Sequence, residues 1–159
     1  GFKGHKNYTV YPAMPPSDYG QMYTNIDVNL AILDHNNFND SKSEIKAIEG
    51  ARYGVPLVAT NTGCYDELIV NGKSGFLIDN TNPKQEWMRV LSRCAKDPKL
   101  VAEMGKNLKL LCDDLYDINK VVGGRLDLYK ELMGMKSSAF SQAKIKSQKT
   151  GRDKNIIPI

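Results

Sequence analysis

Apolar and polar positions along the chain predict an α/β protein. Short apolar runs, rich in β-branched and aromatic residues, have the length of strands. They lie at residues 8–11, 26–33, 55–60 and 75–78. The run at 26–33 alternates at its start and is continuously apolar at its end, which is typical of a strand that enters the middle of a parallel sheet.

The segment from 41 to 60 predicts a helix followed directly by a strand. Ser41-Lys-Ser-Glu44 has the form of a capping box, so the helix is expected to start there and to run to about residue 53. Ile45, Ile48 and Ala51 or Arg52 are expected on its buried face, and Gly54 is expected to end it in a left-handed conformation. A strand, a loop, a helix and a second strand in this order predict a βαβ unit of a parallel sheet.

Helices are predicted on either side of this unit as well. Two short ones are expected at 17–23 and 65–70, and three long ones start at Pro83, at Pro98 and near Asp117. The residues expected on the buried face of the last helix are Val122, Leu126, Tyr129 and Met133.

Composition agrees with a single globular domain. The chain has 159 residues, of which 41% are hydrophobic and 25% charged. We therefore expect one folded α/β body over residues 1–135, with a short, incomplete parallel sheet and C-terminal helices. No apolar run approaches the roughly 20 residues that a membrane-spanning helix needs. Three cysteines at irregular spacing argue against a disulfide framework and a zinc site, so reduced thiols and a cytoplasmic location are expected.

The net charge of +4 belongs to the end of the chain rather than to its body. Residues 136–159 contain six Lys or Arg residues and one Asp, whereas the preceding residues carry 16 basic and 17 acidic side chains. A nucleic-acid-binding fold would carry its basic patch on the folded body, so no nucleic-acid partner is expected. The basic segment is interpreted as a linker or a solvated tail, with peripheral contact to a membrane surface or to a partner protein as the alternatives.

The chemistry that the sequence suggests lies in the loop and helix start between the second and third apolar runs. Ligands of open α/β sheets bind beyond the carboxyl ends of the strands, and a helix N-terminus there attracts an anion. Ser41, Lys42 and Ser43 would add two hydroxyls and an ammonium group to such a phosphate site. The alternative is a simple helix cap with a solvated lysine.

Two further positions extend this candidate site. Glu49 lies within the predicted helix, and its carboxylate can accept the two hydrogen bonds that a ribose diol offers. Gly63 follows the strand at 55–60 and would let a ligand approach the backbone closely. The alternatives are an ordinary surface glutamate and a plain turn.

The residues around this loop resemble a known family. Three parts of the chain resemble the C-terminal, nucleotide-sugar-binding half of GT-B glycosyltransferases of the family 4 type. They are Glu49-Gly-Ala-Arg-Tyr-Gly-Val-Pro-Leu-Val-Ala-Thr60, Gly63 and Glu67-Leu-Ile-Val-Asn-Gly-Lys-Ser-Gly-Phe-Leu-Ile78. The resemblance extends from about residue 8 to residue 133, and it implies a partial Rossmann-like parallel sheet, the C-terminal half of a GT-B fold, with C-terminal helices. The chain also resembles a subgroup of this family that has the pattern F-N-x-x-K-S-x-x-K. The matching residues are Phe38-Asn39, Lys42-Ser43 and Lys46. The pattern is frequent in bacterial and phage enzymes of surface-polysaccharide synthesis.

The resemblance implies that this loop binds the sugar donor. In the family, the second of two glutamates separated by seven residues binds the ribose hydroxyls, and it corresponds to Glu49. The first corresponds to Ser41, so the contact with the donor sugar is expected to differ, with Lys42 and Ser43 as replacements. The donor-binding residues that follow are Phe38, Asn39, Ser41, Lys42, Ser43, Lys46, Glu49, Thr62 and Gly63. No catalytic residue, metal ligand or cofactor is implied beyond the nucleotide-diphosphate sugar, which is the donor substrate.

The resemblance also implies that the chain is part of a larger enzyme. The parent protein is expected to transfer a sugar from a nucleotide-diphosphate sugar to a saccharide or lipid-linked acceptor, and the alternative is a non-catalytic nucleotide- or sugar-binding module. In the family the acceptor site lies in an N-terminal domain, so this chain is expected to be a fragment that is inactive alone. The apolar edge at 26–33 would then be open, which predicts re-pairing of the strand at 8–11 or dimerisation through this edge.

Overall fold

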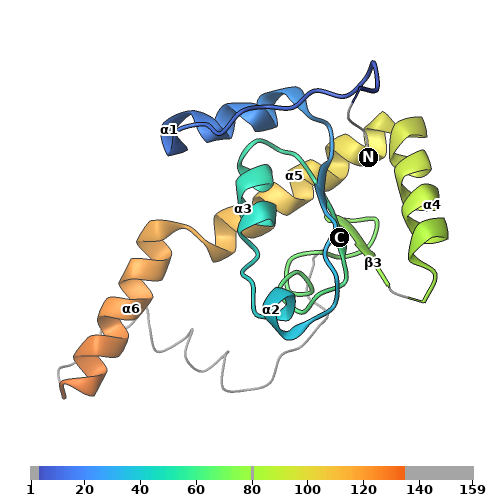
Figure 1. The fold of residues 1–159 in the computed structure, drawn as a ribbon. Helices are drawn as coiled ribbons and strands as arrows, with labels where there is room; N and C mark the ends of the chain where they lie inside the picture. The colour runs from blue at the N-terminus through green and yellow to red at the C-terminus, as the bar shows by residue number, and fades with distance from the viewer. Residues whose placement is uncertain (1–3, 80, 135–159) are drawn as a thin grey trace. The chain divides into compact units, whose positions relative to one another are not determined.

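The computed structural model describes residues 4–79 and 81–134 (Figure 1). The chain divides into two compact units, residues 1–112 and residues 113–159. The predicted basic tail, residues 136–159, lies outside the described residues.

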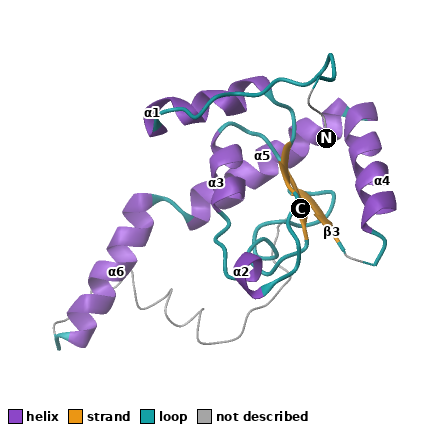
Figure 2. Cartoon of the chain, viewed as in Figure 1, coloured by secondary structure: helices purple, strands orange, loops and turns teal. Residues whose placement is uncertain are grey.

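A parallel sheet of three strands forms the centre of the first unit (Figure 2). The strands are β1 (Asn29–Ala31), β2 (Leu57–Thr60) and β3 (Gly75–Ile78), in the order β1-β2-β3. Leu57 of the central strand lies opposite Asn29 on one side and Gly75 on the other. The α/β class and the parallel sheet are therefore confirmed, with three of the four predicted strands.

The first predicted strand is wrong. Residues 8–11 form no strand, and the side chains of Tyr8, Val10 and Tyr11 are 45%, 69% and 54% exposed. A strand gains its stability from cross-strand neighbours, and a four-residue run of β-formers is too short to form without them. Re-pairing of this segment with the open edge is thus also wrong. Among the described residues β1 pairs with β2 alone, so dimerisation through this edge stays a prediction.

Helix α3 (Ile45–Arg52) packs on β1 and β2 through small residues rather than large ones. Ala51 is buried and Ile48 is half-buried as predicted, whereas Ile45 is 55% exposed. Ala47 and Gly50 are the other buried residues of the helix, so the predicted face is confirmed at Ala51 and wrong at Ile45. Small residues are needed there because Gly50 lies close to the turn that leads into β2 and to the Asn29 side chain of β1. A Cβ atom placed on Gly50 would lie 3.0 Å from the Val55 carbonyl oxygen.

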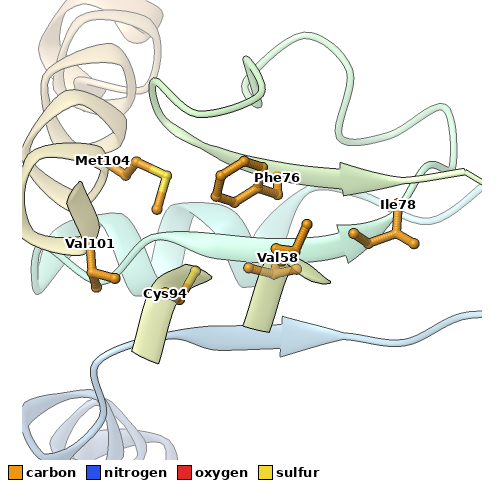
Figure 3. Packing of buried hydrophobic residues seen from close by; sticks show 7 residues of the cluster. Val58, Phe76, Ile78, Cys94, Val101 and Met104 are labelled. Atoms are coloured by element: carbon orange, nitrogen blue, oxygen red, sulfur yellow. The ribbon is translucent and has the colours of Figure 1, made fainter. Parts of the chain in front are cut away.

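The opposite face of the sheet is covered by α4 (Pro83–Lys96) and α5 (Pro98–Leu115), which start at the predicted prolines. Strand and helix side chains meet there in the main core cluster (Figure 3). The cluster consists of Val58, Phe76, Ile78, Val90, Cys94, Val101 and Met104. Helices on both faces of a parallel sheet give the layered arrangement expected of a Rossmann-like fold.

The amino-terminal helical region precedes β1. It consists of the α-helix α1 (Pro16–Tyr19) and the 3-10 helix η1 (Gly20–Asn25), in place of the single predicted helix. Tyr23 of η1 is buried, and η1 contacts α3.

The predicted helix at 65–70 is a series of turns. Ser74 explains the difference, because its buried hydroxyl bonds twice to the backbone of this segment. It donates to the Leu68 carbonyl at 2.8 Å and accepts from the Val70 N–H at 2.9 Å. These two backbone groups are therefore unavailable to continue a helix.

In the second unit, α6 (Ile118–Leu132) starts as predicted, with the Asp117 carboxylate accepting from the N–H groups of Asn119 and Lys120. Its predicted buried face is wrong. The side chains of Val122, Leu126, Tyr129 and Met133 are 51%, 50%, 58% and 74% exposed. The helical repeat decides which residues share a face, but it does not decide what that face packs against.

Candidate functional site

The two predicted parts of the site lie together at the carboxyl ends of β1 and β2. The loop after β1 leads to the start of α3, and the turn after β2 contains Thr62 and Gly63. The Leu33 N–H donates to Thr60 Oγ1 at 3.0 Å and so ties the two segments to each other. The carboxyl edge of a parallel sheet, where ligands of such folds bind, is formed here by the residues that the sequence singled out.

A short helix, α2 (Asn37–Asp40), shapes the first loop. Asn36 caps it by accepting from the Asn39 N–H at 2.8 Å. Asn39 itself is 8% exposed, and its side-chain amide donates to the Asp34 carbonyl at 2.7 Å. The structure therefore gives Asn39 a role in holding the loop.

The predicted capping box is wrong. The Ser41 hydroxyl donates to the Asn37 carbonyl at 2.7 Å and so ends α2 instead of starting α3. The residue at the cap position of α3 is Glu44, and its side chain makes no capping hydrogen bond. The first amides of α3 are thus without a side-chain cap, which suits the binding of an external anion.

Two cationic residues flank this helix start. The Lys42 ammonium lies 4.7 Å from the centroid of the Phe38 ring, which is 76% exposed. Lys46 is exposed, and its backbone carbonyl accepts from the Asn29 side-chain amide at 2.9 Å. Ser43 is exposed between the two lysines. Positive charge and hydroxyl groups therefore lie at the surface around the uncapped helix start.

Glu49 lies one turn further along α3 and is half-buried. The Tyr23 hydroxyl donates to Glu49 Oε2 at 3.0 Å. Burial, together with the hydrogen bond and the charge of Glu49, raises the pKa of Tyr23 above its usual range, so this hydroxyl keeps its proton at alkaline pH values at which an exposed tyrosine loses it. Sequence reasoning missed Tyr23, since no pattern links a position in the amino-terminal helices to one 26 residues later.

The turn after β2 is compact. Thr62 is 1% exposed, its N–H donates to the Thr60 carbonyl at 2.8 Å, and its hydroxyl lies 3.6 Å from Cys64 Sγ. Gly63 is exposed, and a Cβ atom placed on it would meet nothing within 4 Å. Gly63 is therefore the part of this turn that a ligand can reach.

Tyr65, next to this turn, links stability to pH. Its side chain is 2% exposed, and burial, with smaller contributions from Cys64 and Glu44, raises the pKa of Tyr65 to about 12. In the unfolded chain the phenol loses its proton near pH 10. The unfolded state therefore binds fewer protons than the native state between pH 10 and 12, and the free energy of unfolding falls as the pH rises through this range.

We expect Tyr65→Phe to make this fall shallower. The measurement is urea unfolding at several pH values from 8 to about 11.5, a range that brackets the phenol pKa in the unfolded chain. Tyr11→Phe, at a half-exposed position, is the control and should leave the profile unchanged. Equal slopes for Tyr65→Phe and the unsubstituted chain would contradict the prediction.

A pocket of about 790 Å³ lies at the other end of the strands. It is lined by residues that precede β1 and β2, including Tyr23 and Tyr53, and by the adjoining ends of α4 and α5, including Cys94 and Val101. It does not include the predicted donor-binding residues.

Within residues 4–79 and 81–134, no cluster of three or more His, Cys, Asp or Glu side chains is placed to hold a metal ion. In the same part of the chain no helix is long and apolar enough to cross a membrane.

Comparison with known proteins assigns a family to this arrangement. Residues 4–111 match the family described as glycosyl transferases group 1. The chain belongs to this family. The match covers the sheet, the loop after β1 and helices α3 and α4, so the candidate site lies inside the part of the chain that defines membership.

The proteins of similar sequence are much longer than this chain. A D-inositol 3-phosphate glycosyltransferase of Segniliparus rotundus is 27% identical over 100 residues, which is 63% of this chain and 21% of that protein. A putative glycosyltransferase of Bacillus subtilis, YtcC, is 21% identical over 139 residues, or 87% of this chain and 33% of that protein. The chain thus spans a third or less of the length of these relatives.

Solved structures of glycosyltransferases share the fold. The C-terminal domain of a glycosyl transferase group 1 family protein, LpcC of Francisella tularensis, matches with a TM-score of 0.56 and 20% identity over 69% of this chain and 53% of that domain. HepE of Anabaena, in complex with UDP and glucose, matches with a TM-score of 0.53 and 23% identity over 67% of this chain and 28% of that protein. These similarities confirm a Rossmann-like, C-terminal GT-B arrangement.

Proposed function

We propose that this chain is the donor-binding part of a glycosyltransferase that transfers a sugar from a nucleotide-diphosphate sugar to a saccharide or lipid-linked acceptor. The observation that carries the proposal is the position of Glu49. Its carboxylate is held beside the uncapped start of α3, within the segment that matches the glycosyl transferases group 1. The UDP and UDP-glucose complexes of HepE support the choice of donor class.

The chemistry of the site fits such a donor. The positive dipole at the start of α3, with Lys42 and Lys46 nearby, suits a diphosphate, which is the leaving group of the transfer. Glu49 lies four residues after the first residue of α3, which corresponds to a rise of about 6 Å along the axis. In the proposed pose, the diphosphate lies at the helix start and the ribose hydroxyls reach the carboxylate.

The remaining details of the donor site are part of the same proposal. Phe38, Asn39, Lys42, Ser43 and Lys46 follow the F-N-x-x-K-S-x-x-K subgroup pattern, which supports a role in surface-polysaccharide synthesis. The acceptor would bind to an N-terminal domain of the same protein.

Nucleotide binding by the chain tests the proposal directly. Calorimetric titration with UDP, GDP and ADP should show saturable binding of at least one of them, and the matching nucleotide sugar should compete with it. Raised salt should weaken this binding, because exposed lysines contribute to it. If none of the three diphosphates binds, the donor-binding proposal is wrong for this chain.

One observation favours a second candidate, a non-catalytic nucleotide- or sugar-binding module. Ser41 occupies the position of the family's first glutamate, and its hydroxyl is already used within the loop by the Asn37 carbonyl. The two candidates differ in one assay. If a longer parent protein transfers sugar, and if Glu49→Ala abolishes this transfer, the chain is not a non-catalytic binding module.

A further inference from the structure

The Tyr23 side chain lines the pocket at the other end of the strands, and its hydroxyl reaches Glu49 of the candidate site. Its hydroxyl donates to Glu49 Oε2 at 3.0 Å, and the residue is 5% exposed. A buried phenol that donates to a carboxylate makes a charge-assisted hydrogen bond, the stronger kind of side-chain contact.

The Tyr23 ring has little freedom to move. It stacks on Tyr53, with ring centroids 5.8 Å apart and planes at 13°, and it meets the edge of Tyr19 at 6.1 Å and 78°. On the α3 side, a Cβ atom placed on Gly50 would lie 3.7 Å from Tyr23 Cε1. Packing on these sides fixes the direction in which the hydroxyl points.

Through its hydrogen bond, the Tyr23 hydroxyl restricts the orientation of the Glu49 carboxylate. Glutamate loses considerable rotamer freedom when it is held in one orientation, and a ligand that has to impose this order binds more weakly. Tyr23 uses one acceptor position of Oε2, so the remaining lone pairs of the carboxylate can still accept two ribose hydroxyls.

We propose that Tyr23 is a positioning residue, which holds the Glu49 carboxylate in the orientation that receives the ribose hydroxyls of the donor. The inference rests on the proposed function and adds a residue to it. It predicts that loss of the Tyr23 hydroxyl weakens the recognition of ribose specifically, whereas a purely structural role would weaken the binding of every nucleotide alike.

The test compares a nucleoside diphosphate with its 2′,3′-dideoxy counterpart, using the tightest-binding diphosphate of the panel above. The substitution is Tyr23→Phe, which keeps the ring and removes the hydroxyl. We expect the dissociation constant of the ribose nucleotide to rise roughly tenfold, as for loss of about one hydrogen bond's free energy. The dissociation constant of the dideoxy nucleotide should stay unchanged.

Tyr53→Phe is the matched control. It removes a hydroxyl from the ring stacked on Tyr23 but leaves the stacking and the bond between Tyr23 and Glu49 in place. It should leave both dissociation constants as they are. Thermal unfolding of both variants shows whether either substitution disturbs the fold.

The outcomes separate this inference from the proposed function. If Tyr23→Phe weakens both nucleotides equally, or neither, the positioning role is wrong while the donor-site proposal stands. If the unsubstituted chain does not distinguish the two nucleotides, or if Glu49→Ala distinguishes them equally well, the ribose role of Glu49 is wrong, and the positioning role of Tyr23 is wrong as well.

Discussion

Gly105→Ala is expected to lower the free energy of unfolding by about 3 kcal/mol, at the upper end of the usual cost of overpacking. Gly105 lies in α5, where the helix backbone touches the turn between α3 and β2. A Cβ atom placed there would collide with the Gly54 carbonyl and lie 3.2 Å from Pro56 Cδ. Both sides of this contact are backbone or proline, and Gly54 has φ 71°, so neither side can move away at low cost.

Gly123→Ala is the matched control for this substitution. Gly123 also lies within a helix, α6, but a Cβ atom placed on it meets nothing within 4 Å. Alanine should therefore stabilise α6 by up to about 1 kcal/mol through its higher helix propensity. Urea unfolding of both variants measures the two effects, and a similar change in both would show that the contact of Gly105 with the α3–β2 turn is unimportant.

Glu49→Ala is expected to weaken nucleotide binding by about 1–3 kcal/mol, or roughly 5- to 140-fold in Kd, because the ribose hydroxyls lose their acceptor. The same substitution leaves the Tyr23 hydroxyl without its acceptor, so a loss of stability is expected as well. Binding is therefore compared at a temperature at which unfolding curves show both proteins to be fully folded.

Glu103→Ala controls for charge. Glu103 is an exposed residue of α5, and its removal changes the net charge by the same amount. It should leave the dissociation constant as it is. Equal weakening by both substitutions would assign the effect to long-range charge and would contradict a direct contact between Glu49 and the nucleotide.

The sequence predicted best those features of the fold that depend on a few consecutive residues. Pro83 and Pro98 start helices as expected, β3 has its predicted bounds, and Gly54 has the expected positive φ. Each of these features depends on the backbone preferences of a few consecutive residues, which are the same in the isolated segment and in the folded chain.

Burial was harder to predict, because hydrophobicity measures the preference of a side chain and not the space available to it. Ile45 is apolar but exposed, whereas Gly50 and Ala51 of the same helix are buried. Close packing of α3 on the sheet leaves room for small side chains alone, and these carry little hydrophobic signal.

Within the candidate site, the sequence by itself determined the residue types and their neighbourhood. A glutamate lies in the helix after the second apolar run, lysines and serines lie at the helix start, and a glycine follows the next strand. The parallel order of the strands was predicted as well. That order places the loop after β1 and the turn after β2 at the same edge of the sheet. The resemblance to glycosyltransferases followed from the same residues.

Only the tertiary structure decided how these groups are held. It showed that Ser41 ends α2 rather than capping α3, and that Tyr23 donates to Glu49. In both cases the hydrogen-bond partner is chosen by which groups come within about 3 Å of each other after the chain has folded. Such contacts depend on the packing of η1, α2 and α3 around the sheet, and no pattern of neighbouring residues specifies them.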